Sequence, residues 1–208
     1  MYLGFANEEF TRTVTEHIRN ITHVHQGFDT PSRFLLAKKL AERAPSRVNR
    51  VSFTVGGAAA VEGAMKIALK NRENAQEFIT LFDAYHGTTL GVIGGNWVST
   101  MATGKYIGGS RFNRLARQFV RVPNPYCYRC PLGLEKDSCN MMCLKMLRLT
   151  IERGVNGPPA GIIMEPLQAS GGQVIFPKEY HRGVREICDE YVIPLIWDEI
   201  QTYCRIGT

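Results

Sequence analysis

The sequence lacks the features that direct a protein into or across a membrane. Its longest apolar run, around residues 191–197, is far shorter than a bilayer-spanning helix requires. The opening segment, MYLGFANEEF, contains no basic stretch followed by an apolar one, so it does not resemble a secretory signal. From these absences we expect a cytoplasmic protein that has no membrane partner.

The sequence also lacks internal repeats, low-complexity tracts and any concentrated patch of one charge. Its 25 basic residues exceed its 19 acidic residues, but the basic residues are scattered among acidic ones. Nucleic-acid binding requires clustered basic residues, so no nucleic-acid partner is expected. With 44% hydrophobic and 21% charged residues, the composition is that of an ordinary globular protein.

Short aliphatic segments alternate with helical patterns along the chain. The predicted strands are residues 51–55, 78–82, 161–164 and part of 192–201. The predicted helices occupy residues 10–44, the segment after Gly57 and the segment after Pro177, and a loop-rich connection is expected over 94–119. Because the strands are apolar throughout and helices separate them, we predict an α/β fold with a mostly parallel sheet covered on both faces.

The segment GGAAAVEGAMK, residues 56–66, is predicted to turn from a strand into a helix. Its expected apolar face is Ala60, Ala64, Ile67 and Ala68. The free N–H groups at such a helix start form an anion site, but a tight turn chosen only for packing has the same pattern. The segment matches neither the Walker motif nor GxGxxG, so both interpretations stay open.

Polar residues follow two of the predicted strands, where a parallel sheet binds its ligands. Tyr85 can stack on a planar ligand, and His86 can be a polar contact or a proton carrier, although a core tyrosine and a surface histidine are alternatives. Asp198 ends an apolar strand in LIWDEIQ, where a carboxylate needs a cation, a metal or a protonated ligand nitrogen. A salt bridge or a helix cap is the alternative. An anion site, an aromatic platform and a buried acid together match the needs of pyridoxal phosphate.

From about His23 to Thr208 the chain resembles the class III (ω-)aminotransferases, which have the pyridoxal-phosphate fold type I. Four motifs carry the resemblance: GGAAAVEGAMK, YHG, EPLQASGG and DEIQT, in that order. The resemblance implies a three-layer α/β/α large domain that binds pyridoxal 5'-phosphate. It assigns residues 1–45 to a helical lead-in from the small domain and 46–208 to part of the large domain, with a cysteine-containing insert at 124–143.

The resemblance also implies residue roles. Asp198 pairs with the ring nitrogen of the cofactor and is the expected catalytic group. The other expected contacts are the N–H groups of Gly57 and Ala58 to the phosphate, Tyr85 on the ring, His86 as a polar contact, Gln201 to the ring hydroxyl, and Glu165 nearby. In the family, serine usually stands at the position of Gly56 and glutamate at that of Ala59, so those side-chain contacts are lost. The Schiff-base lysine lies beyond Thr208, so the chain is expected to be a fragment that is inactive alone.

The implied reaction is transfer of an amino group from an amino acid or ω-amine to a 2-oxo acid, by a homodimer. Two alternatives remain: a racemase or epimerase on the same fold, and a metal-binding module that has lost catalysis. The last rests on Cys127, Cys130, Cys139 and Cys143, which form CxxC, eight intervening residues and CxxxC. Such thiolates can bind zinc or an iron-sulfur cluster, but spacing alone favours a loop without metal. Cys188 and Cys204 are expected to be ordinary core residues.

Overall fold

The computed structural model describes residues 3–25, 27–45, 47–96, 117–203 and 205–206. The chain divides into two compact units, one up to Ser52 and one that begins at Phe53. In the described part of the chain, no helix has the length and apolar character needed to cross a membrane.

The first unit contains two helices where the sequence predicted one helical stretch over residues 10–44. Helix α1 spans Glu8–Asn20 and helix α2 spans Pro31–Arg43. The interruption has local causes, because the side chains of Asn7 and Thr30 each cap the start of a helix and α2 begins with a proline. None of the described residues of either helix is buried.

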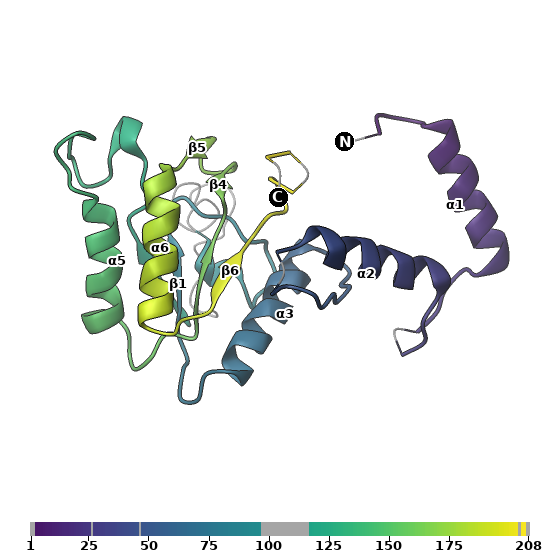
Figure 1. The fold of residues 1–208 in the computed structure, drawn as a ribbon, viewed down its shortest axis with the longest axis horizontal. Helices are drawn as coiled ribbons and strands as arrows, with labels where there is room; N and C mark the ends of the chain where they lie inside the picture. Colours follow the sequence, from purple (N-terminus) through teal and green to yellow (C-terminus); the bar gives the residue numbers. More distant parts are fainter. Residues whose placement is uncertain (1–2, 26, 46, 97–116, 204, 207–208) are drawn as a thin grey trace. The chain divides into compact units, whose positions relative to one another are not determined.

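The second unit is built on a four-stranded parallel sheet with the order β2-β1-β3-β6. Two of its strands, β1 and β6, are labelled in Figure 1. Its strands are β1 Phe78–Leu81, β2 Phe119–Val122, β3 Gly161–Met164 and β6 Leu195–Trp197. A short antiparallel pair follows β3, formed by β4 Leu167–Gln168 and β5 Val174–Ile175. The parallel sheet confirms the predicted fold class.

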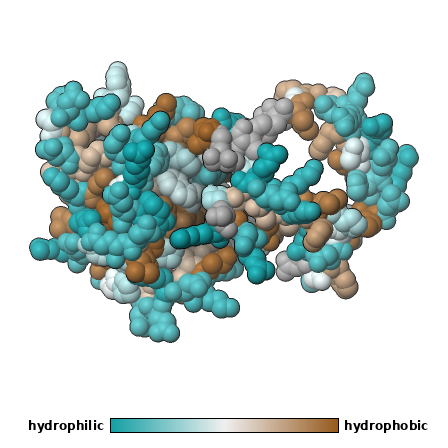
Figure 2. All heavy atoms as spheres, in the orientation of Figure 1, coloured by the Kyte–Doolittle hydropathy of each residue, from teal (hydrophilic) through white to brown (hydrophobic). Residues whose placement is uncertain are grey.

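Helices pack on both faces of this sheet. They are α3 Gly57–Lys70, α5 Met142–Arg153 and α6 Lys178–Glu190, with two 3-10 turns, η1 Ile93–Gly95 and η4 Cys127–Arg129. Helices α5 and α6 pack with Ile79 and Ile162, whereas α3 packs with Phe78 and Ile163. Neighbouring strand residues therefore face opposite helical layers, which is why each strand is apolar throughout. Hydrophilic side chains cover the outward face of α6 in Figure 2.

Two local predictions were wrong. Residues 51–55, all of which the structure describes, form no strand, and the side chain of Val55 is fully exposed. A β-branched run needs a neighbouring strand to pair with, and these residues have none in the described sheets. On α3 the buried residues are Val61, Met65 and Ala68, whereas Ile67 is 63% exposed. The apolar stripe is thus rotated from the predicted one.

Several elements were not predicted, among them β2, α5 and the short pair β4 and β5. Strand β2 lies at the end of the segment taken for a loop-rich connection, most of which is outside the described residues, as is Cys204. Helix α5 follows the cysteine segment, and its mixed polar pattern did not indicate a helix. Cys188 is buried in the core, as predicted.

Helix α5 provides a direct test of the core. Leu147 is 0% exposed and Leu149, on the same helix, is 44% exposed. In the intact protein, Leu147→Ala should lower the free energy of unfolding by about 2–5 kcal/mol, because it leaves a cavity in the core. Leu149→Ala, with the same atoms removed, should change it by less than about 0.5 kcal/mol. Urea denaturation of both variants measures the difference, and equal losses would show that α5 does not pack as described.

Candidate functional site

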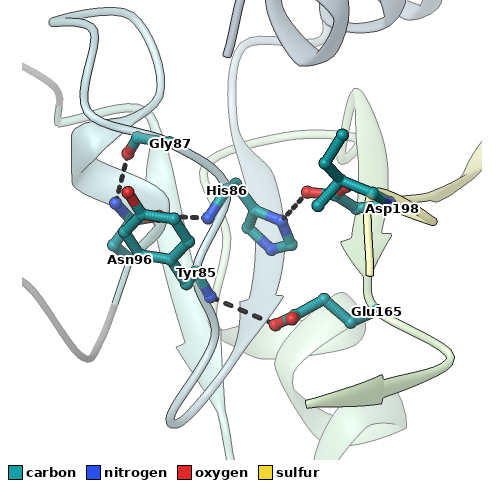
Figure 3. A network of polar contacts seen from close by, with 7 residues as sticks. Tyr85, His86, Gly87, Asn96, Glu165 and Asp198 are labelled. Atoms are coloured by element: carbon teal, nitrogen blue, oxygen red, sulfur yellow. Dashed lines mark hydrogen bonds and ion pairs between the residues drawn. The ribbon is translucent and has the colours of Figure 1, made fainter. Parts of the chain in front are cut away.

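A buried histidine–aspartate pair lies at the carboxyl ends of the parallel strands. The Nδ1 atom of His86, beyond the end of β1, is 2.9 Å from Oδ2 of Asp198, the residue after β6 (Figure 3). The two side chains are 1% and 8% exposed. Parallel strands end at the same edge of a sheet, so residues far apart in sequence meet here.

The His86 main chain is held by Asn96. The backbone N–H of His86 donates to Oδ1 of Asn96 at 2.6 Å, and the Asn96 amide donates to the carbonyl of Gly87 (Figure 3). On the ring, the buried Nε2 atom has no hydrogen-bond partner among the described residues. A buried polar atom without a partner is costly, so Nε2 is available to a ligand.

Glu165 belongs to the same cluster. Its Oε2 accepts a hydrogen bond from the backbone N–H of Tyr85 at 3.2 Å (Figure 3). Burial raises the pKa of Glu165 to about 7, and the charge of His86 and the Tyr85 N–H oppose this rise only in part. The Glu165 carboxyl therefore exchanges its proton near neutral pH.

The start of α3 shares a cavity with Asp198. No side chain among the described residues caps this helix, and its N-cap residue is Gly56. The cavity, of about 200 Å³, is lined by Gly57, Ala60, Val61, Ala64, Ile196, Trp197, Asp198, Glu199 and Ile200. Free N–H groups and the positive end of the helix dipole thus lie beside the same space as the Asp198 carboxylate.

The loop after β1 is fixed to α3 by close contacts. Gly87 has a φ of +108°, and a Cβ at this position would lie 2.5 Å from the Cβ of Ala58. The Thr89 hydroxyl donates to the carboxylate of Glu62 on α3. Only glycine combines this backbone conformation with this close approach. The loop that carries His86 is therefore held against the helix start.

A second polar cluster fixes the other end of the same loop. The amide of Asn124 is 3.1 Å from a carboxylate oxygen of Asp83 and donates to Gln168 at 2.7 Å, and Gln168 donates to the carbonyl of Phe82 at 2.7 Å. Sequence reasoning missed Asn124, Gln168 and Asn96. The only signal for them was their position after, or near, a strand end.

The structure brings together most of the residues that the sequence singled out. Tyr85, His86, Glu165 and Asp198 form one contact network, and Gly57 lines the cavity beside Asp198. Gln201 differs, because it is exposed and its carbonyl, not its side chain, accepts a hydrogen bond from Arg205 at 2.6 Å. The role predicted for Gln201 therefore stays a prediction.

The raised pKa of Glu165 predicts a pH dependence of stability. Between about pH 4.5 and 7 the folded state keeps a proton that the unfolded state has lost, so stability present at low pH is lost as the pH rises through this window. Glu165→Gln should abolish this loss, which amounts to about 3 kcal/mol of the free energy of unfolding. Urea unfolding at several pH values between about pH 5 and 8 measures it. Glu190→Gln is the control, because Arg148 lowers the pKa of Glu190 and its contribution has the opposite sign. Parallel curves for wild type and Glu165→Gln would contradict the assignment.

At the carboxyl edge of a parallel α/β sheet, the structure thus places an uncapped helix start beside a buried acid. The comparison with known families makes this specific. The profile of the family Aminotransferase class-III matches residues 1–207, so the chain belongs to the class III aminotransferases.

Known relatives agree with this membership. An adenosylmethionine-8-amino-7-oxononanoate aminotransferase of Geobacter sulfurreducens is 32% identical over 205 residues, covering 95% of this chain and 44% of the relative. A leucine/methionine racemase of Thermococcus litoralis is 30% identical over 203 residues, covering 96% and 44%. The chain thus spans less than half the length of these relatives.

Solved structures show the same fold. An (S)-enantioselective omega-transaminase of Thermomicrobium roseum aligns with a TM-score of 0.81 and 29% identity, over 94% of this chain and 44% of that one. A PLP-bound amine transaminase from an uncultivated Pseudomonas species aligns with a TM-score of 0.79 and 26% identity, over 96% and 45%. The expected fold-type I architecture is confirmed.

Proposed function

We propose that the protein containing this chain is a pyridoxal-phosphate-dependent aminotransferase that moves an amino group from an amino acid or ω-amine to a 2-oxo acid. The observation that carries the proposal is the buried His86–Asp198 pair, whose carboxylate lines the same cavity as the start of α3. Family membership and the named relatives support it.

The described residues fit pyridoxal phosphate. Its phosphate needs N–H donors, which the uncapped start of α3 supplies at Gly57 and Ala58. Its pyridine nitrogen needs a carboxylate, and Asp198 is a buried one in the adjoining cavity. The unpartnered Nε2 of His86 offers one more polar contact.

When bound, pyridoxal phosphate supplies an electron sink for the carbanion at the amino carbon. Asp198 holds the proton on the ring nitrogen, since a carboxylate in a buried site stabilises a neighbouring cation. His86 orients Asp198 by donating from Nδ1 to Oδ2, while Oδ1 accepts from the backbone N–H of Ile200 at 3.3 Å. A carboxylate has capacity for further donors, so these contacts leave room for the ring N–H.

The remaining roles follow from the family motifs. Tyr85 would stack on the ring, Gln201 would bind the ring hydroxyl, and Glu165 would lie nearby, behind the residues that contact the cofactor or on the substrate side. We further propose that the protein is a cytoplasmic homodimer and that residues 46–208 belong to its cofactor domain, with residues 1–45 leading in from the small domain.

A racemase is the second candidate, because the Thermococcus litoralis relative carries that name. Both reactions form a carbanion and differ in where the proton returns. The intact protein, loaded with pyridoxal phosphate, is incubated with single-enantiomer amino acids with and without a 2-oxo acid. Amino transfer that requires the 2-oxo acid supports the proposal. Appearance of the opposite enantiomer without a 2-oxo acid would support the racemase instead.

A further inference from the structure

Four cysteines outside the candidate active site gather in one segment. Cys127 lies in η4, Cys130 directly follows it, Cys139 lies in the next turn and Cys143 is in the first turn of α5. All four are half-buried free thiols. In Figure 1 this segment forms the loop that precedes α5.

The four cysteines line a single small cavity of about 20 Å³. Its other walls are mainly apolar, and Lys136 is the one charged residue among them. A cavity of this size holds about one water-sized sphere, which suits a single ion better than an iron-sulfur cluster.

The thiols also influence one another electrostatically. The pKa of Cys127 is raised first by burial, and the neighbouring thiols of Cys139 and Cys130 add to the rise while Lys136 opposes it. Burial also raises the pKa of Cys143 to about 11, with Cys139 and Cys127 again among its neighbours. This mutual influence shows that the four thiols lie close to one another.

A buried hydroxyl without a partner among the described residues lies near Cys143. Tyr180 is 0% exposed, and its hydroxyl has no hydrogen-bond partner among the described residues. Its electrostatic neighbours are Cys143 and Cys188. Tyr180 does not line the cysteine cavity, so this hydroxyl is a neighbour of Cys143 and not a wall of the site.

We infer that Cys127, Cys130, Cys139 and Cys143 form a four-thiolate zinc site that fastens residues 124–143 to the starts of α5 and α6. Both helix starts line the cavity, through Met142 and Pro177. Zinc prefers four tetrahedral sulfur ligands, and short paired spacings are typical of its structural sites. Each thiol releases one proton to solvent on binding, which leaves two net negative charges beside Lys136.

Binding requires a small rearrangement. Among the described residues, no three cysteine, histidine or acidic side chains already stand in a finished metal-binding arrangement. Metal binding and local folding are commonly coupled, so zinc would draw the four thiols inward. The sequence alone favoured a loop without metal, and the shared cavity is the observation that changes this expectation.

The test measures metal in the intact protein, purified under reducing conditions without chelators. Elemental analysis should find about one zinc per chain, and the protein should bind cobalt(II) with the charge-transfer absorption of thiolate ligands. Cys130→Ala should retain less than about a tenth of the zinc. Cys188→Ala is the matched control, because Cys188 is a buried thiol in α6 that does not line the cavity. It should keep the full zinc content.

Three outcomes would overturn the inference. The first is only trace zinc in the wild-type protein together with no thiolate–cobalt absorption after reconstitution, a measurement that does not depend on any variant folding. The second is full zinc retention in Cys130→Ala. The third is iron with acid-labile sulfide, which identifies a cluster instead of a single zinc ion. The inference is independent of the proposed aminotransferase activity.

Discussion

Asp198→Asn in the intact enzyme should lower kcat by about a thousandfold, equivalent to about 4 kcal/mol of transition-state stabilisation. Asparagine has nearly the same shape as aspartate but carries no charge. The ring nitrogen of the cofactor therefore loses the partner that keeps it protonated, while the packing around β6 is preserved. The fold should remain, as judged by circular dichroism and by urea unfolding.

The matched control is Asp189→Asn. Asp189 is an exposed acid on α6 that pairs with Arg185 at 2.8 Å. It has no proposed role in cofactor binding. The same chemical change there should leave kcat within about twofold, because exposed ion pairs contribute little. Steady-state kinetics with a saturating amino donor measures both variants. Turnover of Asp198→Asn near the wild-type rate would remove Asp198 from its assigned role.

Gly87→Ala should disrupt the site through the contact between the strand-end loop and α3. An added methyl group would overlap the Cβ of Ala58, at a separation of 2.5 Å, and also occupy a backbone conformation with φ +108°. The strain and the overlap together should lower the free energy of unfolding by about 3 kcal/mol. Because the overlap displaces the N–H groups at the start of α3, affinity for pyridoxal phosphate should fall by about tenfold or more.

Gly172→Ala separates the two causes. Gly172 has a similar φ of +113°, but a Cβ there would meet nothing within 4 Å. This variant should lose about 1 kcal/mol of stability from backbone strain and should keep its cofactor affinity. Urea denaturation and cofactor titration measure both variants. If Gly172→Ala lost cofactor affinity to the same extent, the Gly87–Ala58 contact would not be the reason.

The zinc inference and the aminotransferase proposal concern neighbouring parts of one unit. Asn124 lines the cysteine cavity and also bonds to Asp83 and Gln168 at the end of β1. A metal that orders the cysteine segment would therefore also fix Asn124, which bonds to the loop that carries His86. The proposed zinc ligands and the proposed cofactor contacts are different residues of this chain, so a metal site here does not argue against catalysis.

Several features could be predicted from the sequence because they depend on neighbouring residues. The glycine turn into α3, the apolar strands 78–81 and 161–164, and the amphipathic pattern of α6 all have their causes within a few positions. Asp198 was recognisable for the same reason, as an acid at the end of an apolar run.

Other features depended on residues that are far apart. Residues 51–55 have the composition of a strand, but pairing decides strand formation and no partner strand is described for them. The buried stripe of α3 was set by its contact with Phe78 and Ile163, which local periodicity cannot reveal. The contact of Gly87 with Ala58 also depends on distant residues, because it arises where a loop packs on a helix.

By itself, therefore, the sequence determined the alternation of apolar strands with helices, the parallel α/β class and the residue types at the strand ends. Only the tertiary structure decided which of these side chains meet. His86 and Asp198 are 112 positions apart, and they are paired because β1, β3 and β6 lie side by side and end at one edge of the sheet. The gathering of the four cysteines around one cavity is decided in the same way, since spacing alone does not specify how a loop folds back onto the helices that it joins.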